Sequence, residues 1–258
     1  MRLVLLAPSV LQAFDLRVLE YVFACDRIEI VGAVLDARPG KSRTQRIREE
    51  LRKGRGGYVL VMVVHDLLRR LHRPQREDAA AYFAARGVPT LSARKLYADE
   101  TLDWIRACRP DALFRSAFGI IREPILSIAP GGVLSYHHGN IRRYRGQPVA
   151  FWELYHGERE MGVTIQRLNA GLDSGAIVKE IVVPIHRTDS WATLYRRAYD
   201  ASPALLRDAC LAMEQPGFSP ITIPEEQLGR VFTSPNFRKW LSLQLRVMGR
   251  KLRGEPKL

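Results

Sequence analysis

Apolar and polar positions in the N-terminal half alternate between strand-like and helix-like patterns. Residues 2–7 are almost wholly apolar, as in a buried strand, and residues 11–24 place apolar side chains at helical spacing. A β-branched, apolar run at residues 27–35 predicts a second strand. Strand, helix and strand in this order form a βαβ unit, so the pattern predicts a parallel sheet with a right-handed crossover.

Two further strands are predicted over residues 111–117 and 132–137, with a short helix from about Glu123 to Ile128 between them. Pro124 suits the first turn of that helix. The fold predicted is therefore α/β, with a doubly wound, Rossmann-like, mostly parallel sheet whose ligand lies beyond the carboxyl ends of the strands. The turn after the first strand lacks the GxGxxG pattern, which argues against a nicotinamide cofactor.

Two helices are predicted near the C-terminus, over residues 191–214 and 237–252, around a proline-broken loop at residues 219–224. The second helix carries an apolar face among Arg and Lys, so it docks either on its own domain or on a membrane surface or partner. We predict a catalytic α/β domain over residues 1–189 and a helical C-terminal extension over residues 190–258.

A basic insertion is predicted after the second strand, at about residues 38–77. Residues 43–53 predict a basic helix, which a glycine-rich stretch ends. The apolar run at residues 58–71 fits either a core strand with the start of a helix or a basic amphipathic helix on a membrane or partner. Both alternatives stay open at this stage.

The positive charge of the chain is concentrated in two segments. The 258 residues include 40 Lys and Arg against 27 Asp and Glu, a net charge of +13. Residues 41–73 hold 10 basic and 3 acidic residues (+7), and residues 238–258 hold 7 and 1 (+6), so together they equal the whole excess. Such segments usually meet phosphate, anionic lipid or nucleic acid, and the alternative is an ordinary solvated surface.

The remaining composition is typical of a folded intracellular protein. Hydrophobic residues make up 47% and charged residues 26%, which excludes a disordered chain or a fibre. Cys25, Cys108 and Cys210 have neither metal-type spacing nor the pattern of a disulfide framework. No apolar run approaches the roughly 18 residues of a membrane span, and the N-terminus lacks a cleavage site. We expect a cytoplasmic protein, with attachment to the inner membrane face as an alternative.

The densest group of functional side chains runs from Ser135 to Gly175. His137 ends a predicted strand, where an α/β sheet presents catalytic bases, and Asp173 lies on a Gly- and Ser-rich loop that could bring a carboxylate to the imidazole. A purely structural His–Asp hydrogen bond is the alternative. Because His137 and His138 are adjacent on a strand, they point to opposite faces, and we expect no metal site.

Several motifs occur in a fixed order along residues 110–180. They are Pro110-Asp111-Ala112, Ala117-Phe118-Gly119-Ile120-Ile121, Pro130-Gly131-Gly132-Val133, Tyr144-Arg145-Gly146, Gly162-Val163-Thr164 and Leu172-Asp173-Ser174-Gly175-Ala176-Ile177-Val178. Together they resemble the N10-formyltetrahydrofolate-dependent formyltransferase family, which includes methionyl-tRNA, glycinamide ribonucleotide and sugar N-formyltransferases. The resemblance also extends, more weakly, to residues 1–9, 27–36 and 86–213.

The resemblance implies a catalytic trio of Asn, His and Asp. The His falls on His137 and the Asp on Asp173, but Ser135 stands at the Asn position. In the family the Asn amide stabilises the developing oxyanion, and losing one such donor can cost about 2.7–4 kcal/mol. Ser135 could donate instead, or His138 or Asn140 could supply the donor.

The resemblance also implies binding residues. Those for the folate are Phe118, Gly119, Ile120, Ile121, Leu172 and Asp173, and those for the acceptor are Arg145, Gly146, His138 and Asn140. N10-formyltetrahydrofolate is the expected co-substrate, and no metal is expected. For Arg145, a surface salt bridge is the alternative role.

The acceptor is expected to be a primary amine on a nucleotide-linked amino sugar. The reaction would belong to one-carbon metabolism and would serve biosynthesis. The predicted C-terminal helices do not match the β-barrel of methionyl-tRNA formyltransferase, which stays an alternative with formyltetrahydrofolate hydrolase. The non-enzymatic alternative is a catalytically lapsed scaffold that binds RNA or an anionic membrane through residues 41–73 and 238–258. A homodimer is a further alternative.

Overall fold

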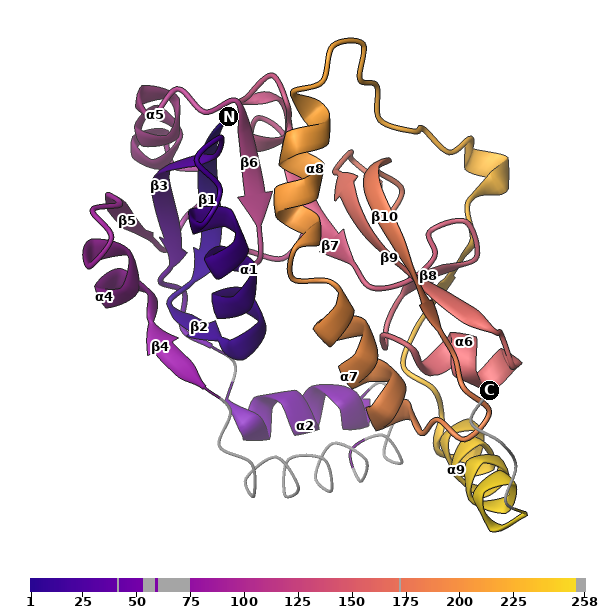
Figure 1. Ribbon diagram of the computed structural model, residues 1–258. Helices are drawn as coiled ribbons and strands as arrows, with labels where there is room; N and C mark the ends of the chain where they lie inside the picture. The colour runs from indigo at the N-terminus through magenta and orange to yellow at the C-terminus, as the bar shows by residue number, and fades with distance from the viewer. Residues whose placement is uncertain (41, 53–58, 60–74, 172, 254–258) are drawn as a thin grey trace.

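A seven-stranded sheet runs through the computed structural model of the protein (Figure 1). The structure describes residues 1–40, 42–52, 59, 75–171 and 173–253. The strand order is β10-β9-β7-β6-β1-β3-β5, and β9 runs antiparallel to its two neighbours, β7 and β10, while the other pairs are parallel. The strands are β1 Arg2–Pro8, β3 Glu29–Asp36, β5 Thr90–Ala93, β6 Ala112–Arg115, β7 Val133–His137, β9 Glu160–Arg167 and β10 Ala176–Pro184. The predicted doubly wound, mostly parallel sheet is confirmed.

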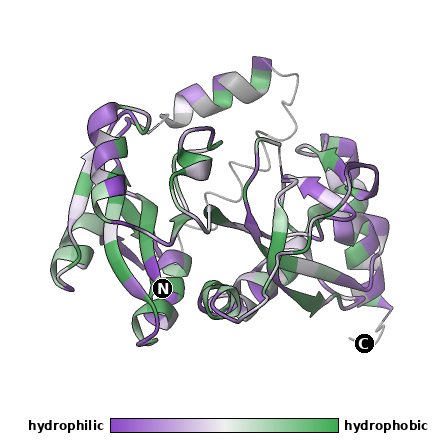
Figure 2. Cartoon of the chain, turned by 90° about the horizontal axis from the view of Figure 1, so that it is seen from above, coloured by the Kyte–Doolittle hydropathy of each residue, from purple (hydrophilic) through white to green (hydrophobic). Residues whose placement is uncertain are grey.

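Helices cover both faces of this sheet because its central strands are apolar on both sides. In β1, Leu3 and Leu5 pack into one core cluster, and Val4 and Leu6 pack into the other. The first cluster is covered by α1 Ala13–Phe23, α4 Ala79–Ala84, α6 Phe151–His156, α7 Trp191–Ala201, α8 Leu205–Met213 and α9 Phe237–Leu252, and the second by α5 Asp99–Ala107 and the 3-10 turn η1 Ile125–Ser127. Figure 2 shows the apolar strands enclosed by more polar helices.

The prediction of one helix over residues 191–214 is wrong, because the structure has two helices there, α7 and α8. Pro203 lies between them, and a proline lacks the N–H of a helical hydrogen bond and disfavours helical backbone in the residue before it. The helix predicted from Glu123 to Ile128 is also wrong. Only the 3-10 turn η1 forms there, in a segment that Pro124 and Pro130 limit to less than two turns.

Two small sheets were missed in the sequence. β2 Val10–Gln12 pairs with β4 Arg76–Asp78, so α1 begins only at Ala13, where Asp15 accepts a hydrogen bond from the Gln12 N–H at 2.9 Å. β8 Tyr144–Gly146 pairs in parallel with β11 Arg230–Phe232, next to the 3-10 turn η2 Glu225–Gln227. The second pairing brings residues near the C-terminus to the loop that follows β7.

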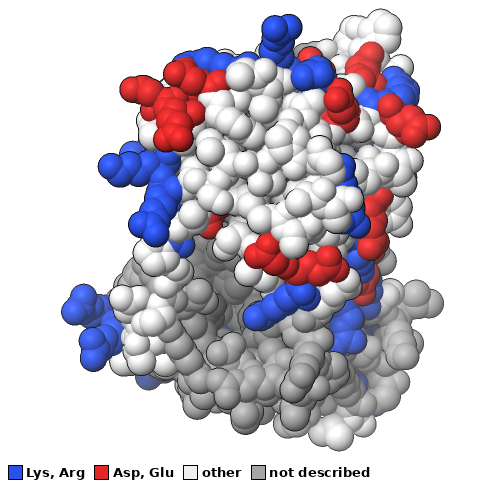
Figure 3. Space-filling model, turned by 90° about the vertical axis from the view of Figure 1, so that its left-hand side faces the viewer, with Lys and Arg blue, Asp and Glu red and all other residues white. Residues whose placement is uncertain are grey.

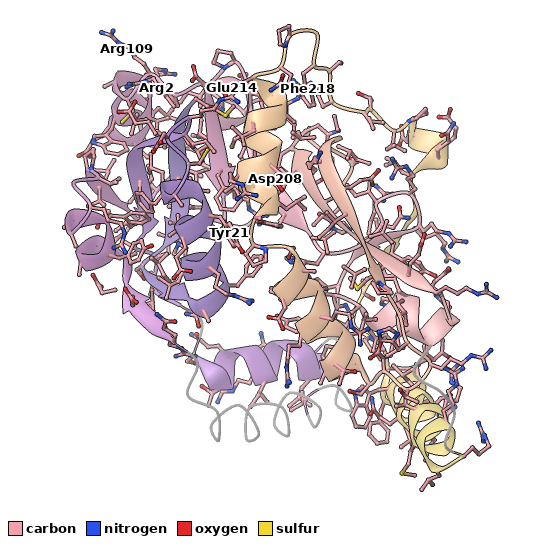
Figure 4. The ribbon with its side chains drawn as sticks, viewed as in Figure 1. Arg2, Tyr21, Arg109, Asp208, Glu214 and Phe218 are labelled. Atoms are coloured by element: carbon pink, nitrogen blue, oxygen red, sulfur yellow. The ribbon has the colours of Figure 1, made fainter. Side chains whose placement is uncertain are left out.

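α8 fixes the N-terminus of the chain to the C-terminal region. It packs on α1 and β10, and Leu206 and Cys210 lie fully buried in the same core cluster as β1. In Figure 4, Asp208 of α8 and Tyr21 of α1 lie at the boundary between the two helices, and Glu214 lies near Arg2. The Glu214 carboxylate accepts from the Met1 ammonium at 2.8 Å. A domain boundary at residue 190 stays a proposal.

The basic helix predicted after the second strand is confirmed as α2 Arg43–Arg52. The apolar run at residues 58–71 lies outside the described residues, apart from Val59. On the face shown in Figure 3, acidic side chains stand among the basic ones around a broad uncharged area, so this face is not uniformly basic. No helix in the described part of the chain is long and apolar enough to cross a bilayer.

Candidate active site

Three neighbouring strands align polar side chains near the carboxyl edge of the sheet. Arg115 of β6 is paired with Ser135 of β7, and Ser135 is paired with Gln166 of β9. Residues that are paired across strands point to the same face of a sheet, and residues two apart on one strand also share a face. Arg115, Ser135, Gln166 and His137 therefore lie on one face, at the edge where the ligand of a doubly wound sheet binds.

His137 is held at both ring nitrogens. Its Nε2 lies 2.9 Å from the carbonyl oxygen of Tyr144, which accepts only, so Nε2 carries a hydrogen and donates it. Its Nδ1 lies 3.6 Å from Asp173 Oδ1. Because Nε2 is committed to a carbonyl, Nδ1 is the ring nitrogen that faces the carboxylate. The pair predicted from the sequence is thus brought together.

Asp173 reaches the imidazole from the loop between β9 and β10. Its backbone has φ of +45°, a left-handed conformation that Asp adopts more readily than most residues. Oδ2 accepts from the Gly146 N–H at 3.0 Å, and Gln166 Nε2 lies 3.5 Å from Oδ1. Gln166 Oε1 in turn accepts from Gly175 N–H at 3.2 Å. The loop is therefore fastened to both β8 and β9.

Each partner shifts the pKa of the other. Burial on its own lowers the pKa of His137, but the Asp173 carboxylate and the Tyr144 carbonyl outweigh burial and raise it above its usual value. Burial likewise raises the pKa of Asp173, and the hydrogen bonds from His137, Gly146 and Gln166 lower it overall. The pair therefore favours the imidazolium and carboxylate forms more than the two side chains would alone, which suits a proton-transferring group.

Ser135 is buried and its hydroxyl is engaged. Its Oγ accepts from Arg115 Nη1 at 3.2 Å, and its own hydrogen faces the carbonyl oxygens of Arg115 and Tyr136, each at 3.4 Å. The Arg115 side chain also donates from Nε to the Ala117 carbonyl at 3.2 Å. Sequence reasoning missed Arg115. The only signal was a single charged residue in an otherwise apolar strand.

The predicted folate residues form a turn directly after β6. Phe118 and Gly119 both have φ of +70°, which reverses the chain at the carboxyl edge of the sheet. The Phe118 and Ile121 side chains are buried, whereas Ile120 is 66% exposed. The Arg38 guanidinium lies 5.3 Å from the centre of the Phe118 ring. Leu172 lies outside the described residues.

The predicted acceptor residues divide into two groups. Arg145 and Gly146 belong to β8, and Arg145 Nε donates to the Gly229 carbonyl at 2.6 Å. Asn140 lies in the loop before β8, where its Oδ1 accepts from the Arg142 N–H at 3.0 Å. His138 lies elsewhere, among aromatic rings that include Tyr199, stacked at 4.0 Å. The roles of these residues in binding stay predictions.

Glu153 is a buried carboxyl behind His137 that sequence reasoning also missed. It lies on α6 within the apolar run Phe151–His156 and is only 3% exposed. Burial raises its pKa to about 7, while His137 acts in the opposite direction. The local signal was one acidic residue at a helix position otherwise typical of the core.

Replacing Glu153 by Gln is expected to stabilise the protein at pH 8 and to change little at pH 5. The folded carboxyl has a pKa of about 7 and the usual value is 4.5, so stability falls as the pH rises through this window and stays low above it. At about 1.36 kcal/mol per pH unit, the cost above pH 7 is roughly 3 kcal/mol. Thermal unfolding at both pH values tests this. An equal shift of Tm at pH 5 and pH 8 would contradict it.

Among the described residues, no group of three His, Cys, Asp or Glu side chains could hold a metal ion. His137 and His138 illustrate why. His137 faces Asp173, whereas His138 is stacked between aromatic rings, and burial lowers its pKa to about 3. The two adjacent imidazoles therefore do not meet at one point.

A doubly wound sheet binds its ligand beyond the carboxyl ends of its strands, and the His137–Asp173 pair lies at that edge. The family model for formyl transferase matches residues 37–210, and the chain belongs to that family. The matched residues include Arg115, Ser135, His137 and Asp173. The predicted membership of the formyltransferase family is confirmed.

Comparison with known proteins gives two kinds of relative. The chain is 33% identical over 206 residues to a methionyl-tRNA formyltransferase of Anaeromyxobacter dehalogenans, covering 78% of this chain and 66% of that protein. It therefore spans just under two thirds of that relative. A second such enzyme, from Anaeromyxobacter sp. strain K, is 34% identical, covering 77% and 65%.

Solved structures share the fold over most of the chain. An N-formyltransferase of Helicobacter canadensis, crystallised with folinic acid and dTDP-3-aminofucose, has a TM-score of 0.57 and 13% identity and covers 98% of this chain and 82% of its own. A phosphoribosylglycinamide formyltransferase of Anaplasma phagocytophilum has a TM-score of 0.58 and 15% identity, covering 90% and 99%. At these identities the likeness shows the fold alone.

Proposed function

We propose that the protein transfers the formyl group of N10-formyltetrahydrofolate to a primary amine on a nucleotide-linked amino sugar. The observation that carries this proposal is the His137–Asp173 pair at the carboxyl edge of the sheet, in the chain's formyl transferase region. The turn at Phe118 and Gly119 lies at the same edge, one strand away, and offers a surface for the pterin. The fold relative that was crystallised with folinic acid supports this co-substrate.

His137 and Asp173 have different roles in the proton transfer. The co-substrate supplies the formyl carbon, which the acceptor amine attacks. The charged His137 ring gives its Nδ1 proton to the leaving nitrogen N10, and the neutral ring then takes up the proton that the amine loses. Asp173 keeps the imidazole oriented and stabilises its charged form. Tyr144 prevents the ring from turning, because its carbonyl holds Nε2.

The choice of acceptor rests on the comparisons and on charge. The Helicobacter canadensis enzyme, bound to an amino sugar on dTDP, covers almost the whole chain. A sugar 3N-formyl transferase, crystallised with dTDP and 5-N-formyl-THF, covers 96% of this chain with a TM-score of 0.58 and 13% identity. Arg145 on β8, next to the Gly146 that donates to Asp173, is a basic side chain that suits a diphosphate. A methionyl-tRNA acceptor is the second candidate, because the sequence relatives above carry that name.

A mass-spectrometric assay with N10-formyltetrahydrofolate and three acceptors tests the proposal. The acceptors are a dTDP-linked 3-amino sugar, methionyl-tRNA and glycinamide ribonucleotide, and a reaction without acceptor measures hydrolysis. We expect a formyl adduct on the amino sugar alone. Formylation of methionyl-tRNA would move the function to the second candidate. Release of formate at the same rate with and without amine would indicate a hydrolase.

α9 presents an apolar stripe to solvent in addition to its buried face. Leu243 and Val247 are buried, whereas five apolar side chains spaced by four, four, three and four residues are exposed. They are Phe237, Leu241, Leu245, Met248 and Leu252. The helix holds five basic residues and no acidic one, and Arg246 lies over the Tyr155 ring of α6 at 4.7 Å. We propose that this stripe docks on an anionic membrane surface.

Replacing Leu245 and Met248 together by Ser is expected to abolish sedimentation with vesicles that contain phosphatidylglycerol. The two changes remove the centre of the stripe and leave all basic residues in place. Phosphatidylcholine vesicles and a Val182→Ser variant, which alters an exposed valine on β10, serve as controls. The result would be different if the stripe joined two copies of the chain. The wild-type protein would then stay in solution as a dimer, and the double variant would be a monomer.

A further inference from the structure

The oxyanion donor of this site is absent from the position at which the family carries it. Ser135 stands there, and a serine side chain is shorter than an asparagine amide by a carbonyl group. Its hydroxyl accepts from Arg115 and turns its own hydrogen towards backbone carbonyls at 3.4 Å. Ser135 therefore offers an acceptor, not a donor, in this arrangement.

Arg115 fills the space beside Ser135 on the same face of the sheet. It is the last residue of β6 and is paired directly with Ser135. Nε donates to the Ala117 carbonyl, and Nη1 donates to Ser135 Oγ. A guanidinium has five N–H donors, so these two bonds orient the fork and leave further donors at its end.

Burial and one nearby carboxylate, that of Asp173, act on the charge of Arg115. Burial lowers the pKa of Arg115, and the nearby Asp173 raises it. Among the residues that the structure describes, no carboxylate forms an ion pair with the guanidinium, whereas Asp173 is already engaged by His137, Gly146 and Gln166. A partly buried cation without a close anion is costly to keep, unless an anion forms next to it during the reaction.

We propose that the Arg115 guanidinium, aimed by Ser135, stabilises the oxyanion that develops on the formyl oxygen. This inference rests on the proposed function. The amine nitrogen bonds to the formyl carbon, and the carbonyl π electrons move to the oxygen beside Arg115. When the intermediate collapses, the bond from carbon to N10 breaks, and its electron pair stays on N10. The oxyanion electrons re-form the formyl C=O bond, N10 receives the Nδ1 proton of His137, and His137 regains a proton from the amine.

This assignment gives Ser135 a positioning role and explains the departure at that residue. An asparagine at position 135 would place a longer side chain where the guanidinium now lies. Arginine on β6 and serine on β7 therefore form a matched pair that replaces one amide donor by a charged one. Because charged donors form the stronger hydrogen bonds, the exchange keeps the site competent.

Arg115→Met is expected to lower kcat about 10²–10³-fold, the loss typical of one missing oxyanion donor. The affinity for 5-formyltetrahydrofolate, measured by calorimetry, should change less than threefold, because the donor acts on the transition state. Arg106→Met is the matched control, since Arg106 pairs with Asp103 on the exposed face of α5. An Arg115→Ala variant leaves more space beside Ser135, so adding guanidinium chloride should restore part of the kcat that this variant loses.

Ser135→Ala tests the positioning role and should lower kcat less than Arg115→Met does. The double variant Arg115→Met with Ser135→Asn should recover more than tenfold over Arg115→Met, because it rebuilds an amide donor. An Arg115→Met enzyme within threefold of wild-type kcat, folded by thermal unfolding, would overturn the inference. A wild-type protein that neither binds 5-formyltetrahydrofolate nor transfers formyl would instead remove the proposed function.

Discussion

Replacing Asp173 by Asn is expected to lower kcat/KM for formyl transfer by about 10²–10⁴-fold, the range for loss of a general acid–base unit. Asn is close to Asp in size, so the loop keeps its shape. Its amide keeps an oxygen for the Gly146 N–H but has no charge to hold the His137 imidazolium. The variant removes the electrostatic support of the imidazolium, together with the oxygen that accepts from Gln166 Nε2.

The pH profile of the same variant separates a catalytic pair from a structural one. Asp173 is the strongest cause that raises the pKa of His137, whereas burial lowers it. Without the carboxylate, the pKa of His137 should fall below its usual value of 6.5. The limb of the kcat/KM profile that belongs to His137 should therefore move to lower pH. A variant with wild-type rate and an unshifted profile would show that the pair is only structural.

Replacing Gly146 by Ala is expected to destabilise the protein by about 3 kcal/mol or more. Gly146 has φ of +92°, and an added Cβ would collide with the carbonyl oxygen of Phe232 on β11. The pairing of β8 with β11 would have to open, and the same glycine donates its N–H to Asp173. Stability and site geometry should therefore be lost together.

Gly157→Ala is the matched control for this prediction. Gly157 also has positive φ, +78°, but nothing lies within 4 Å of the position of its Cβ. Only the conformational cost of about 1–2 kcal/mol should apply. Urea unfolding of both variants measures the difference. Equal losses of unfolding free energy in the two variants would contradict a specific contact between β8 and β11.

Four strands of the central sheet, β1, β3, β6 and β7, were predicted from their largely apolar runs, whereas β5, β9 and β10 were not. Leu3, Leu5 and Ala7 face one core cluster and Val4 and Leu6 the other, so this strand reads as buried without knowledge of its neighbours. α9 was predicted with the bounds that the structure shows, because its apolar periodicity is uninterrupted over sixteen residues. Local pattern was sufficient in both cases.

The elements that were missed depend on long-range contacts. β8 and β11 each have three residues, and neither shows a strand pattern until residues 144 and 230 are brought together. The divided helix had a local signal, Pro203, which outweighs the helical periodicity around it. The His137–Asp173 pair was found through the ordered motifs. Arg115 was not found, because the direction of its side chain becomes known only when β6 is paired with β7.

The most direct test of the account is a single-turnover reaction of the wild-type protein and the Asp173→Asn variant with N10-formyltetrahydrofolate and a dTDP-linked 3-amino sugar. Formylated amine and tetrahydrofolate are measured over time, and 5-formyltetrahydrofolate binding is measured alongside. The account predicts equal amounts of both products from the wild-type protein and a much slower reaction in a variant that still folds. The account would be contradicted if the wild-type protein neither binds the folate nor formylates the amino sugar, methionyl-tRNA or glycinamide ribonucleotide.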